Sequence, residues 1–210
     1  MANIIENEMA NTPLSEEEGR RLQDLVVDFK NRGLGLMSLN QYIGAVAALH
    51  MKAPCNMLVF GLGKDAELWL DVNKGGRTVF LEDDAEWIDA FKDQDMEIYE
   101  VKYDTKVEDH LEIGFDKEKL QMDLPEEVTS EEWDVVFVDG PLGHNPPRPY
   151  KGPGRMKSMY AAYKLLKDDG YCIVDDIGRL VEREYAYHYF GLDPYIVEGK
   201  LAIFKGKLDV

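Results

Sequence analysis

The chain has few basic residues for its length. Lys and Arg number 24 against 41 Asp and Glu, so the formal net charge is -17 over 210 residues. A surface of this sign repels phosphate groups. Nucleic acid and anionic membranes are therefore disfavoured as general partners, and an anionic substrate would require a local group of basic side chains.

Cysteine is also scarce, because the sequence contains only Cys55 and Cys172. Both lie in apolar stretches, where a free thiol behaves as a small hydrophobic residue. We expect both thiols to be reduced and buried in the core. This expectation argues against a disulfide-built fold and fits a reducing compartment.

Long apolar runs are missing as well. No stretch approaches the roughly 20 residues of a membrane-spanning helix. The first residues, MANIIENEMANTPLSEEEG, carry five Glu and no apolar run of signal-peptide length. We expect a chain without signal peptide or membrane span, located in the cytoplasm or excised as a soluble domain. No pattern in the sequence predicts an oligomeric state.

The length fits one catalytic domain with a short N-terminal addition. Residues 1–14 are predicted to be a flexible leader. Ser15, followed by three Glu, is typical of a capped helix start. A helix from there to about residue 31 and a second over about 39–51 form a predicted helical addition over residues 15–53.

Residues 54–210 alternate short apolar runs with helical segments. The runs are NMLVF, RTVFLE, EIYEVKY, WDVVFVDG and YCIVDD. This alternation is typical of a parallel sheet with helices on both faces. The last segment, PYIVEGKLAIFKG, holds two strands with almost no room between them. We predict an α/β, Rossmann-like domain with a mostly parallel seven-stranded sheet and a C-terminal antiparallel hairpin.

Ligands of such sheets bind at the carboxyl ends of the strands. The first apolar run is followed by Gly61-Leu62-Gly63, where two glycines allow a tight turn and close approach of a ligand. Alone, this turn fits a plain strand-to-helix connection equally well. Twenty-one residues after Gly61 the second run ends in Glu82, the position from which a carboxylate binds ribose hydroxyls. Together they favour a nucleoside cofactor.

Other residues near the ends of these runs indicate a cofactor site less specifically. Asp83 either joins the cofactor site or caps the next helix. Asp104, after the third run, either reaches the adenine amino group or is a turn residue. Trp87, Ile88 and Phe91 recur at helical spacing and are predicted to be mainly core residues.

The glycine pattern also distinguishes between cofactors. A dinucleotide fingerprint requires a third glycine, but residue 66 is Ala. S-adenosylmethionine needs only the tight turn, and a terminal antiparallel strand pair completes the sheet of class I methyltransferases. The sequence therefore favours methyl transfer over hydride transfer.

Acidic residues follow the fourth and fifth runs, namely Asp139, with Gly140 beside it, and the pair Asp175 and Asp176. Methyl transfer to an alcohol requires a deprotonated or polarised hydroxyl. Asp139 and Asp176 are therefore candidate catalytic bases. Alternatively, Asp139, Asp175 and Asp176 hold a divalent cation such as Mg, Mn or Co, or they only cap helices and turns. We place Asp139 and Gly140 also among the cofactor contacts.

Basic residues near these acids are candidates for binding an acidic sugar or for balancing the acids, although each alone is commonly a surface charge. With one loop histidine they form the predicted substrate-binding set: His144, Arg148, Lys151, Arg155 and Arg179.

Several segments resemble the plant glucuronoxylan 4-O-methyltransferase family of polysaccharide biosynthesis. The similar blocks run in order from about Cys55 to Lys205 and include VKYDTKVED, VDGPLGHNPPRPYKGPGRM and IVDDIGRLVE. The most specific pieces are NKGGRTVFLE at 73–82 and PGRM at 153–156, because a generic nucleotide-binding fold requires neither.

The resemblance implies a class I methyltransferase fold, S-adenosylmethionine as methyl donor and transfer to a glycosyl hydroxyl such as that of glucuronic acid. It further implies that Gly61, Gly63 and Glu82 contact the cofactor. Asp139 and the loop at 153–156 would then lie near the acceptor.

Two departures from the family pattern matter. Plant members carry a membrane anchor that this sequence lacks, which implies a cytoplasmic or excised domain instead of a Golgi setting. They tend to have His-Asp where this chain has Asp175-Asp176, a pair closer to metal-dependent catechol-type enzymes. Two alternatives stay open: a metal-dependent O-methyltransferase of small molecules, and a non-catalytic binding protein of polysaccharide assembly.

Overall fold

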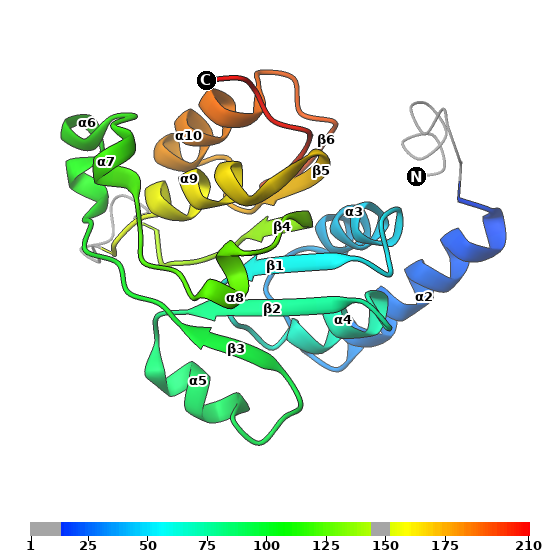
Figure 1. Cartoon of the computed structure of the whole chain (residues 1–210). Coiled ribbons are helices and arrows are strands. Elements are labelled where there is room, and N and C mark those ends of the chain that lie inside the picture. Colours follow the sequence, from blue (N-terminus) through cyan, green and yellow to red (C-terminus); the bar gives the residue numbers. More distant parts are fainter. Residues whose placement is uncertain (1–13, 144–151) are drawn as a thin grey trace.

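The computed structural model describes residues 14–143 and 152–210. Seven strands of this part form one sheet in the order β3-β2-β1-β4-β5-β7-β6 (Figure 1). Strands β1 to β5 pair in parallel, whereas β7 is antiparallel to both β5 and β6. The strands are β1 (Asn56–Phe60), β2 (Arg77–Glu82), β3 (Glu97–Glu100), β4 (Trp133–Val138), β5 (Leu166–Val174), β6 (Ile196–Glu198) and β7 (Leu201–Lys205).

The central strands are buried on both faces. In β1, Met57 and Val59 belong to one apolar cluster and Leu58 and Phe60 to the other, and all four are at most 3% exposed. Successive side chains of a strand point to opposite faces. This double burial explains why the strand reads as a continuous apolar run in the sequence.

Helices cover each face of the sheet. One apolar cluster contains residues of α6 to α10, and the other contains residues of α2, α3 and α4. Figure 1 shows α9 and α10 side by side. The helices are α2 (Glu16–Asn31), α3 (Leu39–His50), α4 (Ala66–Val72), α5 (Ala85–Phe91), α6 (His110–Ile113), α7 (Lys117–Leu120), α8 (Glu126–Thr129), α9 (Met156–Leu165) and α10 (Leu180–Phe190), with the short 3-10 helix η1 (Val107–Asp109).

The two N-terminal helices begin at capping boxes, in which Ser15 pairs with Glu18 and Ser38 with Gln41. The predicted capped start at Ser15 is thus confirmed. Helix α3 packs directly against the sheet, since Val46 lies in the same apolar cluster as β1 residues. The boundary predicted at residue 53 therefore does not separate two apolar cores, although the domain division itself stays a prediction. Most of the predicted leader lies outside the described residues.

The predicted fold class is confirmed, including the mostly parallel sheet, the terminal hairpin and helices on both faces. Cys55 and Cys172 are free and buried, as expected. The prediction for Trp87 was wrong, because this side chain is 37% exposed and stacks on Phe91 at the surface end of α5. Helix α5 contains no fully buried residue and only rests on the sheet edge.

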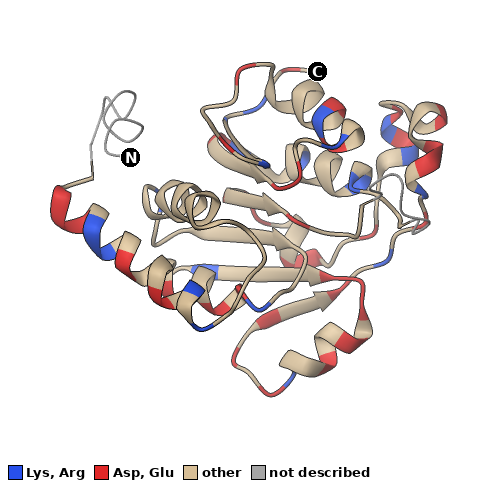
Figure 2. Cartoon of the chain, turned by 180° about the vertical axis from the view of Figure 1, so that it is seen from behind, with Lys and Arg blue, Asp and Glu red and all other residues tan. Residues whose placement is uncertain are grey.

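Acidic residues are spread over the described chain, with several on α2 and α5 (Figure 2). Within the described ranges, no helix is both long and apolar enough to span a membrane.

Candidate active site

The sheet reverses its strand order between β1 and β4, and the turns after these two strands touch. Gly61 follows β1 with φ of +108°, and Gly140 follows β4. A Cβ atom on Gly61 would lie 3.1 Å from the Gly140 nitrogen, and one on Gly140 would lie 2.8 Å from the Gly61 Cα. Only glycine permits this approach. The two turns therefore pack backbone against backbone at the switch point, where open α/β sheets bind ligands.

The Glu82 carboxylate is held against this turn. It lies at the end of β2, is 7% exposed, and accepts a hydrogen bond from the Leu62 backbone nitrogen at 2.6 Å. Its other oxygen accepts from the backbone nitrogens of Asp83 and Asp84, each at 2.9 Å. Burial raises the pKa of Glu82, and these donors oppose the rise. About four lone-pair positions exist on a carboxylate, so a ribose hydroxyl can bind at the one that remains.

The other cofactor candidates differ in position. Gly63 lies in the same turn, where a Cβ atom would meet the Asp65 carboxylate at 2.7 Å. The backbone nitrogen of Asp83 donates a hydrogen bond to Glu82, and Asp83 itself is exposed to solvent. Asp104 pairs with the buried Lys157 of α9 at 2.6 Å, so the structure gives its carboxylate a partner within the chain. The predicted contact of Asp104 with adenine stays a prediction.

Acids from β4 and β5 converge on one guanidinium. Arg155, 5% exposed, donates from Nη2 to Asp139 and to Asp176, each at 3.3 Å. Its remaining nitrogens donate to the backbone carbonyls of Pro141 at 3.2 Å and Asp175 at 2.9 Å. We predicted Arg155 to bind substrate, but these bonds direct it into the protein. Arg155 therefore balances the charges of Asp139 and Asp176, which is the second of the two roles that its place in the sequence allows.

A second arginine continues the network. Arg179 pairs with Asp176 at 2.8 Å and with Glu182 at 3.3 Å. Glu182 is 1% exposed, and its burial raises its pKa against the opposing charges of both arginines. Asp176 has φ of 60°, and within the described ranges it is the one non-glycine residue in the left-handed region. Such strained positions gather at functional sites.

Desolvation raises the pKa of both Asp139 and Asp175. For Asp139 the charge of Arg155 opposes this effect. For Asp175 the charges of Asp139 and Asp176 add to it and bring the pKa to about 6. A carboxylate that is partly protonated near neutrality can take up and release a proton, which suits a general base.

Two contacts from α3 could not be predicted from the sequence. The Tyr42 hydroxyl, fully buried, donates to Asp65 at 3.1 Å, and Gln41 donates to Asp175 at 3.5 Å. In the sequence, both residues look like ordinary positions of an amphipathic helix. Only the packing of α3 on the sheet shows their contacts. They connect the N-terminal helices to the turn after β1 and to the acids.

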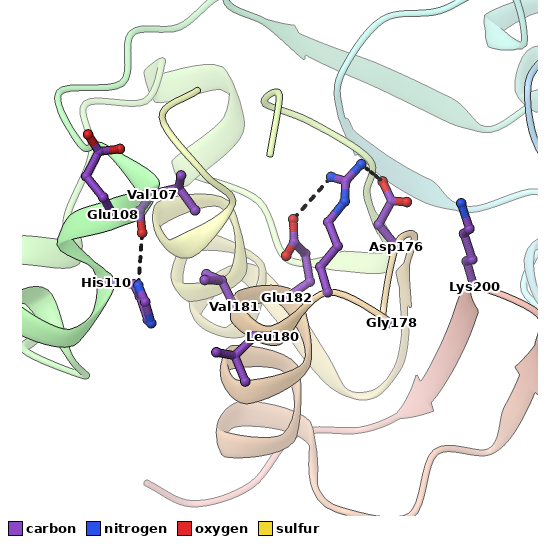
Figure 3. A pocket seen from close by; sticks show the side chains of 10 residues that line it. Val107, Glu108, His110, Asp176, Gly178, Leu180, Val181, Glu182 and Lys200 are labelled. Atoms are coloured by element: carbon purple, nitrogen blue, oxygen red, sulfur yellow. Dashed lines mark hydrogen bonds and ion pairs between the residues drawn. The ribbon is translucent and has the colours of Figure 1, made fainter. Parts of the chain in front are cut away.

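A pocket of about 480 Å³ opens beside these acids, and we call it the α10 pocket. Figure 3 shows that η1 and α6 form one wall, the start of α10 another, and Lys200 lies beyond Asp176. Its volume is in the range of small-ligand sites. The pocket is lined by Val107, Glu108, His110, Asp176, Gly178, Arg179, Leu180, Val181, Glu182 and Lys200.

Three predicted substrate-binding residues, His144, Arg148 and Lys151, lie outside the described residues. Arg179 is placed at the α10 pocket. Val107, His110 and Lys200 line the same pocket but were not predicted, because their segments are distant from the acids in sequence.

The predicted divalent cation does not fit this arrangement. Within the described ranges, no group of three His, Cys, Asp or Glu is placed to hold a metal. The position between Asp139 and Asp176 is taken by the Arg155 guanidinium, which would have to leave before a cation could bridge them.

The sheet order and the glycine turn define the fold of the class I methyltransferases. A putative caffeoyl-CoA O-methyltransferase from Staphylococcus aureus superimposes with a TM-score of 0.51 at 12% identity, covering 88% of this chain and 92% of that chain. A 16S rRNA methyltransferase from T. thermophilus, in complex with AdoMet and guanosine, gives 0.50 at 14% identity, covering 82% of this chain and 44% of that chain. S-adenosylmethionine is thus the cofactor bound by a neighbour of this fold.

The chain belongs to the IRX15/IRX15L/GXM family, whose model matches residues 42–121 and 111–204. It is 37% identical over 160 residues to glucuronoxylan 4-O-methyltransferase 3 of Arabidopsis thaliana, a match that covers 66% of this chain and 52% of that protein. The chain spans about half the length of the curated relatives it matches. The family resemblance found in the sequence is confirmed.

Proposed function

We propose that this protein is an S-adenosylmethionine-dependent O-methyltransferase that acts on a sugar hydroxyl of a glycan. The acceptor is a residue like glucuronic acid or another glycosyl unit. The observation that carries the proposal is the pairing of a glycine-lined switch point with partly buried acids at the ends of β4 and β5. Membership of a family with a glucuronoxylan 4-O-methyltransferase supports the choice of a glycan.

The backbone at Gly61, Leu62, Gly63 and Gly140 would hold the cofactor, because these residues follow β1 and β4 at the switch point of the sheet. Glu82 would bind the ribose through its remaining acceptor position. Asp139 extends from the same edge and offers a negative charge to a sulfonium cofactor. When bound, S-adenosylmethionine supplies the methyl group and keeps the electron pair of the broken carbon–sulfur bond on its sulfur.

Asp176 is the better placed base of the two candidates, because it lines the α10 pocket. Its carboxylate takes the proton of the acceptor hydroxyl while the oxygen bonds to the methyl carbon. The protonated Asp176 carboxyl would then return its proton to water. Arg155 and Arg179 fix the orientation of the Asp176 carboxylate.

The free and buried thiols of Cys55 and Cys172 support a reducing compartment such as the cytoplasm as the site of action.

Labelled methyl transfer to a panel of oligosaccharides, glucuronoxylan fragments among them, tests the proposal. We expect Asp176→Asn and Asp139→Asn to lower kcat by about 100-fold or more, while Asp123→Asn at an exposed position leaves it unchanged. Near-normal rates in both site variants would remove the carboxylates from the chemistry. Activity should survive EDTA, and its loss with recovery on adding a cation would restore the metal version.

The acceptor panel also separates the alternatives. Transfer to catechols and never to saccharides would overturn the glycan assignment. If calorimetry detects no binding of S-adenosylmethionine at millimolar concentration, only a non-catalytic binding role remains.

A further inference from the structure

The α10 pocket is lined by two basic side chains, Arg179 and Lys200, and they differ in their partners. Arg179 is already paired with Asp176 and Glu182. Lys200 is exposed and forms no ion pair with any residue in the described ranges. Its ammonium is therefore the positive charge at this pocket that a ligand can pair with, without breaking a contact inside the protein.

The backbone fixes Lys200 beside the candidate base. It lies in the tight turn between β6 and β7, directly after Gly199 with φ of 60°. Its carbonyl accepts a hydrogen bond at 2.8 Å from the nitrogen of Ile177, the residue after Asp176. The terminal hairpin thus carries a cation to the same pocket that the Asp176 carboxylate lines (Figure 3).

We propose that Lys200 is a specificity-determining residue that binds the carboxylate of an acidic sugar in the α10 pocket. This inference rests on the proposed function and adds the residue that would select the acceptor. With the sugar carboxylate on Lys200, a ring hydroxyl is presented to Asp176.

The remaining walls suit a sugar ring. Val107, Leu180 and Val181 give an apolar surface for the C–H face of a pyranose, and Leu180 is 51% exposed although it is a large apolar residue. His110 donates from Nδ1 to the Val107 carbonyl, which can only accept. Three acidic residues line the pocket. Asp176 and Glu182 both pair with Arg179, and Glu108 on η1 interacts with other groups.

The test compares two acceptors that differ only in charge: a glucuronic-acid-bearing xylo-oligosaccharide, and the same oligosaccharide with its carboxyl reduced to a primary alcohol. For Lys200→Met we expect KM for the acidic acceptor to rise about tenfold, as for the loss of one charged hydrogen bond. We expect kcat to change by less than about twofold and KM for the reduced acceptor to stay near the wild-type value. Lys200→Arg should retain most of the preference for the acidic acceptor.

Lys205→Met serves as the matched control, because Lys205 is an exposed lysine at the opposite end of β7. Binding of S-adenosylhomocysteine, measured by calorimetry on each variant, confirms that the cofactor site is intact. If Lys200→Met keeps the wild-type ratio of the two KM values, Lys200 does not select the carboxylate and the proposal is overturned. The same holds if Lys205→Met raises KM for the acidic acceptor equally.

Failure of the proposed function has a different signature. If wild-type protein methylates neutral saccharides and has no preference for the acidic acceptor, the function stands and the role of Lys200 falls. If it binds no cofactor or methylates no saccharide, both fall together.

Discussion

Replacing Arg155 with methionine is expected to lower the free energy of unfolding by about 3 kcal/mol at neutral pH. Removing one partner of a buried ion pair costs about 3–5 kcal/mol, because the other charge stays buried and unpaired. Arg155→Met leaves Asp176 with only Arg179, and it removes the donors to two backbone carbonyls. The Asp139 side chain is 37% exposed, so water compensates part of the loss and places the value at the lower end.

The loss should also depend on pH. Arg155 lowers the pKa of Asp139, so its removal moves the folded-state pKa further above the ordinary value. A folded chain with such a raised pKa binds a proton that the unfolded chain has released, and its stability falls as pH rises. The deficit of Arg155→Met relative to wild type should therefore be larger at pH 8 than at pH 5.

Urea denaturation at both pH values measures these differences. Arg155→Lys keeps the charge but loses the planar fork and should be intermediate. Arg183→Met, at an exposed position of α10, should stay within about 0.5 kcal/mol of wild type. A deficit below about 1 kcal/mol for Arg155→Met, or one that grows as pH falls, would refute the role of Arg155 as internal counter-ion.

Three further changes test other parts of the site. Gly61→Ala should weaken binding of S-adenosylhomocysteine by at least about tenfold in calorimetry, because the new Cβ would lie 3.1 Å from the Gly140 nitrogen; an unchanged affinity would contradict the close approach. Tyr42→Phe should lower the free energy of unfolding in urea by about 1–3 kcal/mol, since it leaves the buried Asp65 without its hydroxyl donor; equal stability would show that this bond is dispensable. Burial raises the folded-state pKa of Asp65, so this group contributes most stability below the unfolded pKa of about 3.9 and loses it as pH rises through the folded value. Asp65→Asn should therefore flatten the pH dependence of the urea midpoint, and a slope equal to that of wild type would argue against a raised pKa.

The sheet could be predicted because its central strands are buried on both faces. Runs such as residues 57–60 are apolar throughout, and parallel strands bring the residues that follow them to one edge. Gly61, Glu82 and Asp139 therefore gather as the topology requires. The short spacing between β6 and β7 leaves room only for a hairpin.

Contacts between distant segments could not be predicted in the same way. From its place near the acids in sequence, Arg155 could either bind an acidic sugar or balance the acids, and only the structure shows that it pairs with Asp139 and Asp176. Lys200 reaches the pocket only because β7 pairs with β5, and Trp87 is exposed because α5 lies at the sheet edge. Helical periodicity shows which face of a helix is apolar, but it does not show how deeply that face is covered.

A crystal structure of the protein with S-adenosylhomocysteine tests the account most directly. We predict the adenosyl group across residues 61–63, its ribose hydrogen-bonded to Glu82, and the sulfur directed toward Asp139. Ligand density at another place, with Glu82 still bound only to its own backbone donors, would contradict the assignment of the active site.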